Sequence, residues 1–168
     1  MHLLRDPFSE ARGRAALRVV CIGNRWRSDD AAGLAVAEGL RGTLPEGVAL
    51  LECEGEPTAL IDAWEGAELV WLVDAVSSGD RPGTIHRLDA SEHELPAALF
   101  RASTHHVGLS EAVELARALS RLPRQTVVFG IEGGDFQVGN VLSDPVALAV
   151  GQVVEAVRKE VDECMRKP

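Results

Sequence analysis

Hydrophobic positions along the chain follow two patterns, short continuous apolar runs and longer stretches with apolar residues at helical spacing. Continuous runs predict strands buried on both faces, and helical spacing predicts amphipathic helices. The predicted strands span residues 17–22, 48–53, 68–76, 84–89 and 125–131. The predicted helices span residues 29–40, 57–64, 108–122 and 144–165.

The order of these elements predicts a fold class. The first three strands alternate with two helices, which is typical of right-handed crossovers and therefore of an α/β fold with a parallel sheet. Residues 84–89 alternate apolar and polar positions after a turn-rich segment, which predicts a half-exposed strand at a sheet edge. Residues 91–104 have only weak periodicity, so we expect a long excursion containing an irregular helix.

The length of 168 residues fits one domain with its own core, which we place at residues 17–168. We expect residues 1–16 to be an N-terminal tail, because they lack the apolar stretch of a secretory signal. An arginine-rich transit peptide is the alternative for this tail, but Asp6 and Glu10 count against it. No apolar run approaches the roughly 18 residues of a membrane helix, so we expect no membrane contact.

Charge and cysteine content narrow the function classes. Acidic residues outnumber basic ones by 26 to 17, and the net charge of -9 would repel the phosphate backbone of a nucleic acid. The three cysteines form no CxxC pair, which disfavours a disulfide scaffold or a cysteine zinc site. We therefore expect a cytoplasmic protein that binds no nucleic acid.

Acidic and imidazole side chains follow the ends of several predicted strands. Asp29 and Asp30 come after the first strand, Asp74 ends the third, and His105 and His106 precede the helix at residue 108. In open α/β sheets such positions meet at the carboxyl edge, where two carboxylates and one imidazole would suit Ni²⁺ or Zn²⁺. The plainer alternatives are that Ser28 or one of the first two aspartates caps the following helix, that Asp74 fixes a loop, and that the histidines are solvated.

Several competing motifs are absent or incomplete. The first loop lacks GxGxxG, and its paired aspartates would repel a pyrophosphate. Residues 108–112 nearly match the nucleophile elbow GxSxG, but every histidine precedes Ser110, so the hydrolase order of Ser, acid and His is impossible. Cys21 lies in an apolar strand, which favours a buried structural thiol over a nucleophile. The zinc peptidase motif HExxH is missing.

Five segments in chain order together resemble one family, the hydrogenase maturation endopeptidases, which trim the C-terminus of the large subunit of nickel-iron hydrogenases. These segments are Gly23-Asn24 with Asp29-Asp30 and Gly33, Val73-Asp74-Ala75-Val76, Ser103-Thr104-His105-His106-Val107-Gly108-Leu109, Ile131-Glu132, and Leu142-Ser143-Asp144-Pro145-Val146. The resemblance covers about residues 18–157. Two positions depart from the family pattern: Ala31 stands where glycine is frequent, and Gly55-Glu56 stands where Gly-Thr is common.

The resemblance implies a fold, an activity and a site. The fold would be a three-layer α/β/α sandwich with a twisted, mostly parallel sheet, and we expect residues 84–89 to be its antiparallel edge. The activity would be an endopeptidase acting on the precursor of a hydrogenase large subunit once its nickel is loaded, so that nickel comes with the substrate. Asp30, Asp74 and His105 would be both the catalytic residues and the metal contacts.

Other functions and metal sources are compatible with the same residues. The protease would either meet nickel on its substrate or bind a metal of its own first, since two carboxylates and one imidazole suffice for both. A non-catalytic nickel-binding assembly chaperone for the same partner is the alternative function, and a small α/β domain whose aspartates only cap helices is the plainest one. For a single domain that grips a larger partner we expect a monomer.

Overall fold

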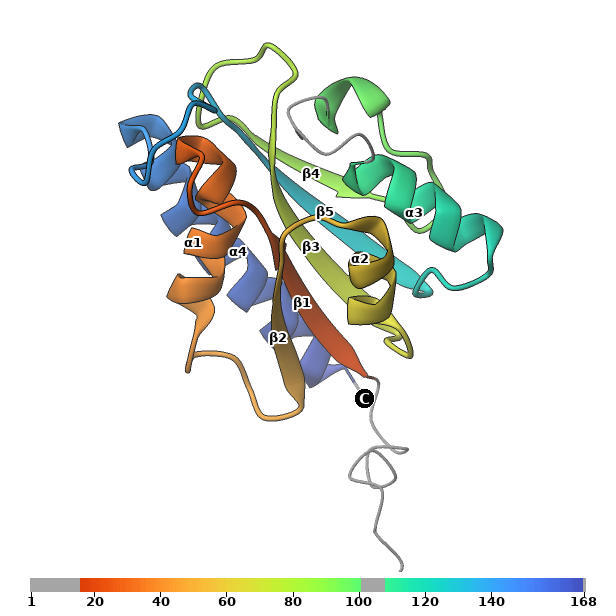
Figure 1. Cartoon of the computed structure of the whole chain (residues 1–168). Coiled ribbons are helices and arrows are strands. Elements are labelled where there is room, and N and C mark those ends of the chain that lie inside the picture. The colour runs from red at the N-terminus through yellow and green to blue at the C-terminus, as the bar shows by residue number, and fades with distance from the viewer. Residues whose placement is uncertain (1–15, 101–107, 168) are drawn as a thin grey trace, which may run out of the picture.

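The computed structural model describes residues 16–100 and 108–167, and residues 1–15, 101–107 and 168 lie outside the described part. Its five strands form one sheet in the order β2-β1-β3-β5-β4 (Figure 1). The strands are β1 (Leu17–Ile22), β2 (Val48–Cys53), β3 (Leu69–Val76), β4 (Ile85–Asp89) and β5 (Gln125–Glu132). The helices are α1 (Ala32–Leu40), α2 (Pro57–Trp64), α3 (Leu109–Ala118) and α4 (Asp144–Arg166), with short 3₁₀ turns at Ser28–Ala31 and Ala97–Phe100.

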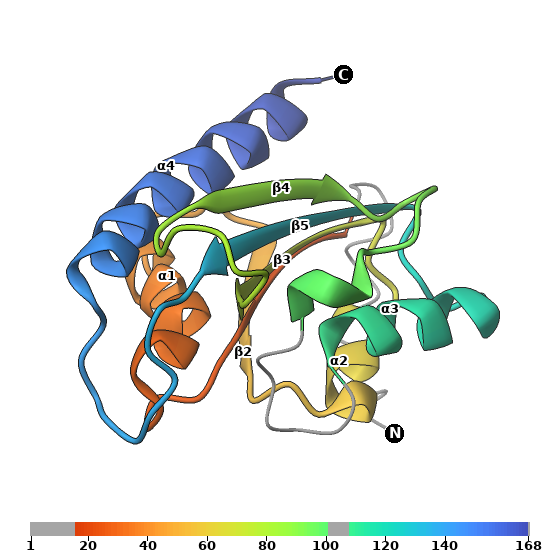
Figure 2. The ribbon, with the colours of Figure 1, turned by 90° about the horizontal axis from the view of Figure 1, so that it is seen from above.

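Four strands run parallel and β4 pairs antiparallel with β5 at one edge, which confirms the predicted sheet and its edge strand. Figure 2 shows α1 and α4 on one face of the sheet and α2 and α3 on the other. The predicted three-layer α/β/α sandwich is therefore confirmed. None of the helices in the described ranges is both long and apolar enough to cross a membrane.

Alternate residues of the central strands serve the two faces of the sheet. Val19 and Cys21 of β1 join the core that faces α1 and α4, whereas Val20 and Ile22 join the core that faces α2 and α3. This follows from the two-residue side-chain period of a strand. All but one residue of β3 are buried, which is why its sequence is a nearly continuous apolar run.

Two helices differ from their predicted limits, each for a local reason. The helix expected at residues 29–40 starts as the 3₁₀ turn and becomes α-helical only at Ala32. The helix expected at residues 108–122 ends at Ala118, because Ser120 adopts a left-handed conformation with φ 55°. Its neighbour Arg121 then donates its backbone N–H to the Ala116 carbonyl at 2.8 Å, as in a Schellman motif.

A close helix–strand contact fixes the first loop over the sheet edge. A methyl group on Gly33 of α1 would lie 2.1 Å from the Ile22 carbonyl oxygen and 2.7 Å from that of Val73. Only glycine allows the backbone of α1 to approach β1 and β3 this closely. The contact holds the 3₁₀ turn, and with it Asp30, above the carboxyl ends of both strands.

Candidate active site

A small pocket lies at the carboxyl ends of β1, β2 and β3. Asp30 reaches it from the 3₁₀ turn, Asp74 from β3 and Glu54 from the residue after β2. The other residues that line it are Ile22, Gly23, Gly55, Ala75, Phe100 and Leu109. The structure thus places two of the three predicted site residues in one pocket, at the sheet edge where the order of elements located them.

The two aspartates interact electrostatically. Burial raises the pKa of Asp74 well above its ordinary range, and the negative charge of Asp30 raises it further, while a backbone hydrogen bond from Ala75 acts in the opposite direction. At neutral pH two such carboxylates are stabilised by a shared proton or by a cation. The oxygen donors therefore fit a divalent metal ion.

Asp29 does not cap the first helix, contrary to one sequence expectation. The residue is fully buried, and its carboxylate accepts hydrogen bonds from the backbone N–H groups of Gly134, Asp135 and Ser143 at 2.8–2.9 Å and from the Ser143 hydroxyl at 2.9 Å. Within the described ranges, no side chain forms an N-terminal capping hydrogen bond with the 3₁₀ turn or with α1. Asp29 is an anchor for the loop between β5 and α4.

The 3₁₀ geometry separates the roles of the neighbouring aspartates. In a 3₁₀ turn successive side chains are rotated by about 120°, so Asp29 and Asp30 point in different directions. Asp30 lies 3.8 Å from the Arg27 guanidinium, which in turn donates to the Phe136 carbonyl at 2.9 Å. The loop after β5 therefore supports both aspartates, one by direct bonds and one through Arg27.

His105 and His106 lie outside the described residues, so the imidazole of the proposed set stays a prediction. Phe100 and Leu109, near the two ends of the 101–107 segment, both line the pocket.

Glu54 is a pocket residue that the sequence reading missed. It follows the end of β2, so the positional argument that selected Asp74 would have selected it too. Glu56, which stands where threonine is common in the family pattern, is a structural residue: its carboxylate caps α2 by accepting from the N–H groups of Thr58 and Ala59.

The rejected nucleophiles are confirmed as structural residues. Cys21 is completely buried, and burial raises the pKa of its thiol, with smaller contributions from Glu52 and Cys53. Ser110 is buried in the first turn of α3, where its hydroxyl donates to the Glu111 carboxylate at 2.9 Å. Neither residue lines the pocket.

The chain is similar in sequence to curated hydrogenase proteins. The chain is 27% identical over 123 residues to the hydrogenase expression/formation protein HupD of Thiocapsa roseopersicina, and the match covers 72% of this chain and 56% of that protein. It is 27% identical over 131 residues to HupM of Azotobacter chroococcum, covering 76% of this chain and 63% of that one. The chain thus spans little more than half the length of these curated relatives.

Solved structures show the same architecture. The hydrogenase maturating endopeptidase HybD from E. coli superposes with a TM-score of 0.76 at 23% identity, over 88% of this chain and 92% of that one. The [NiFe] hydrogenase maturation protease HybD from Thermococcus kodakarensis gives 0.66 at 26% identity, over 86% and 98%. The family model for hydrogenase maturation proteases matches residues 35–160. The chain therefore belongs to the hydrogenase maturation protease family.

Proposed function

We propose that this chain is an endopeptidase that removes a C-terminal extension from the nickel-loaded large subunit of a nickel-iron hydrogenase. The observation that carries the proposal is the pairing of Asp30 and Asp74 in one pocket, where burial and mutual repulsion raise the pKa of Asp74. Family membership supplies the reaction class. Two carboxylates held together against their repulsion are what a site for a visiting cation requires.

Each proposed site residue has a distinct task. Asp30 and Asp74 offer oxygen ligands, and His105 is the third, nitrogen ligand in the proposal. Nickel held by the substrate would polarise the scissile carbonyl when these residues complete its coordination. One of the two carboxylates would accept a proton from the attacking water and return it to the leaving amine. A precursor without nickel would lack the ion that these ligands recognise.

The surface beside the pocket fits a protein substrate. Trp26 is 66% exposed and Val138 is 91% exposed, and both belong to loops next to the 3₁₀ turn that carries Asp30. The Gly139 N–H donates to the Trp26 carbonyl at 2.9 Å, and the Ser28 N–H donates to the Gly139 carbonyl at 3.0 Å, so the two loops form one support. In the proposal these two exposed apolar side chains would contact the precursor when it docks.

The test is mass spectrometry of nickel-loaded precursor before and after incubation with the protein. We expect loss of a C-terminal peptide with the unaltered chain, and no cleavage with Asp30→Asn, Asp74→Asn or His105→Ala. Asp162→Asn, an exposed aspartate on α4, is the matched control and should cleave normally. Wild-type cleavage by all three site variants would refute the proposed residues.

Two further outcomes separate the parts of the proposal. Equal cleavage of nickel-free precursor would refute recognition through the substrate's nickel but leave the peptidase activity standing. A stoichiometric complex with the precursor and no change in its mass would instead identify the non-catalytic assembly chaperone.

A further inference from the structure

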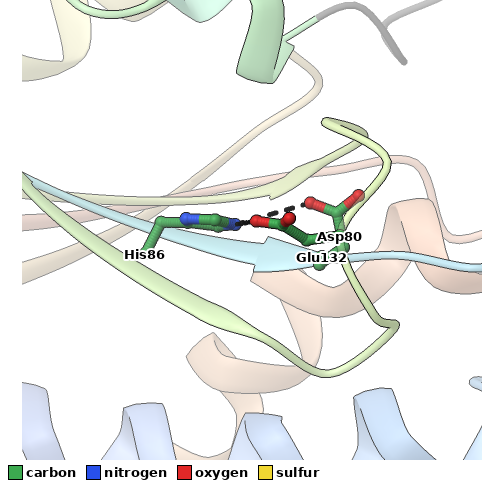
Figure 3. Close-up of side chains that lie close together, drawn as sticks. All are labelled: Asp80, His86 and Glu132. Atoms are coloured by element: carbon green, nitrogen blue, oxygen red, sulfur yellow. Dashed lines mark ion pairs between the residues drawn. The ribbon is translucent and has the colours of Figure 1, made fainter.

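A second group of potential metal ligands lies at the same edge of the sheet, beyond β5. Figure 3 shows Asp80, from the loop between β3 and β4, next to His86 of β4 and Glu132 at the end of β5. One ligand atom from each residue lies within 4.8 Å of the other two. None of the three lines the pocket of Asp30 and Asp74. This cluster is separate from the candidate active site.

One ring nitrogen of His86 faces the two carboxylates without a hydrogen bond. Its Nε2 atom is buried and has no hydrogen-bond partner among the residues that the structure describes. It lies 3.4 Å from an Asp80 carboxylate oxygen and 3.5 Å from one of Glu132. Charge-assisted hydrogen bonds are shorter, about 2.7–2.9 Å, so an imidazolium bonded to these carboxylates would bring the atoms closer.

The two separations from His86 Nε2 are those expected between ligands of one tetrahedral ion. Two ligand atoms bound to Zn²⁺ at about 2.0–2.1 Å in a tetrahedron lie about 3.3–3.4 Å apart. Octahedral Mg²⁺ at about 2.1 Å would bring neighbouring ligands to about 3.0 Å, closer than the 3.4–3.5 Å seen here. Ca²⁺ binds oxygen ligands, whereas imidazole suits Zn²⁺, so the spacing and the ligand types together favour zinc.

The cluster is also built in the way metal sites are. Glu132 is nearly fully buried, and its carboxylate is oriented by the N–H groups of Ser78 and Gly79 at 2.8 and 3.0 Å and by the Ser78 hydroxyl at 2.8 Å. Hydrogen bonds of this kind fix the ligands of metal sites. The Asp80 side chain is 57% exposed, which gives an ion a path from solvent.

The geometry points to a Zn²⁺ site formed by Asp80, His86 and Glu132, with the fourth position open to solvent. Two carboxylates and a neutral imidazole carry two negative charges, which one divalent cation balances. The bound ion would tie the loop between β3 and β4 to strands β4 and β5.

The experiment is calorimetric titration of the full chain with ZnCl₂, in the Asp30→Asn, Asp74→Asn double variant so that the candidate active site loses both of its proposed carboxylate ligands. We expect one Zn²⁺ per chain, and His86→Gln in this background should weaken binding by at least about tenfold. His93→Gln, which alters an exposed histidine, is the matched control and should leave the affinity unchanged. The result is independent of peptidase activity, so it stands or falls separately from the proposed function.

Two measurements guard against misfolding of the His86 variant. Asp80→Asn alters an exposed side chain and should also weaken Zn²⁺ binding, while the circular dichroism spectrum stays unchanged. Co²⁺ bound at the site should show the visible absorption of a tetrahedral complex, which His86→Gln abolishes. Absence of Zn²⁺ binding would overturn the proposal. So would an affinity in the His86 and Asp80 variants that equals that of the double-variant background.

Discussion

Replacing Asp29 by asparagine should destabilise the fold far more than its single-atom change suggests. One oxygen of the Asp29 carboxylate accepts three hydrogen bonds, from Gly134, Asp135 and the Ser143 hydroxyl, and the other accepts one from the Ser143 N–H. In its best orientation the asparagine places its carbonyl oxygen where it can still accept the three hydrogen bonds from Gly134, Asp135 and the Ser143 hydroxyl. Its NH₂ group then faces the Ser143 N–H, so that two donors oppose each other.

The magnitude follows from these contacts. The lost bond to a charged acceptor costs about 1.5–3 kcal/mol, and a buried donor without a partner costs about 1–3 kcal/mol more. We therefore expect a loss of about 3–5 kcal/mol, a large part of the 5–15 kcal/mol typical of a domain. Because the anchored loop also supports Asp30 through Arg27, cleavage should weaken together with stability.

Urea unfolding followed by fluorescence measures the effect, since Trp64 and Trp71 are buried in the two cores. The control Asp162→Asn, at an exposed position, should change the free energy of unfolding by no more than about 0.5 kcal/mol. A loss below about 1 kcal/mol for Asp29→Asn would show that the four hydrogen bonds do not carry the anchor.

The same anchor has a pH signature. Burial acts to raise the pKa of Asp29, but the hydrogen bonds from Ser143, Gly134 and Asp135 outweigh it, so the pKa is lowered from its ordinary 3.8. A group with a lowered pKa stabilises the fold above its ordinary pKa, and this stability is lost as the pH falls through the folded-state pKa. The stability gap between wild type and Asp29→Asn should therefore shrink below pH 3.8. A gap that stays constant in acid would contradict this assignment.

Three further changes test other parts of the structure. Asp74→Asn should leave the protein equally or more stable at neutral pH, because the raised pKa means that ionised Asp74 destabilises the fold above its ordinary pKa of 3.8. This advantage should shrink as the pH falls, and a loss of stability in urea would count against the repulsive pair. Gly33→Ala should destabilise the fold by about 1–3 kcal/mol or more, because the new methyl group would clash with backbone atoms. Gly151→Ala, whose methyl group meets nothing within 4 Å, should stabilise the fold by about 0.5–1 kcal/mol, and similar melting temperatures for the two variants would refute this reasoning. Glu160→Gln should lower the free energy of unfolding by about 1–3 kcal/mol at neutral pH, because it weakens the hydrogen bonds from Arg87 and Trp71. Burial raises the pKa of Glu160 less than these bonds lower it, so the loss should fade below the ordinary pKa of 4.5, and a pH-independent loss would exclude the ionised pair as its source.

Much of the fold is readable from local pattern. The continuous apolar run of β3 predicted a central strand, because a strand buried on both faces is apolar at nearly every position. The alternation in residues 84–89 predicted an edge strand, because a strand buried on one face is apolar only at every second position. The position of Asp74 at the end of β3 placed it at the carboxyl edge, where it shares a pocket with Asp30. Segments spaced along the chain indicated the family, which the family model shows.

The pairing of distant segments is not written in any local pattern. The β4 strand follows β3 in the chain but lies beyond β5, and this brings His86 next to Glu132. The left-handed Ser120 ended α3 earlier than its periodicity predicted, because one backbone conformation outweighs a continuing pattern of side chains. The periodicity of residues 91–104 showed only an irregular stretch, of which Ala97–Phe100 forms a 3₁₀ turn and residues 101–104 lie outside the described part.

Asp29 and Asp30 show which properties the sequence could predict and which depended on the tertiary structure. The sequence by itself determined the class of fold, the sheet edge that carries the chemistry and the acidic residues placed there, because strand burial and strand ends are local properties. The family resemblance already chose Asp30 for the site, but only the tertiary structure gave Asp29 its role as an anchor, since the partners of Asp29 lie 105–114 residues away. The physical reason is that a carboxylate takes its role from the donors and charges around it, and here the folded chain supplies them from distant segments.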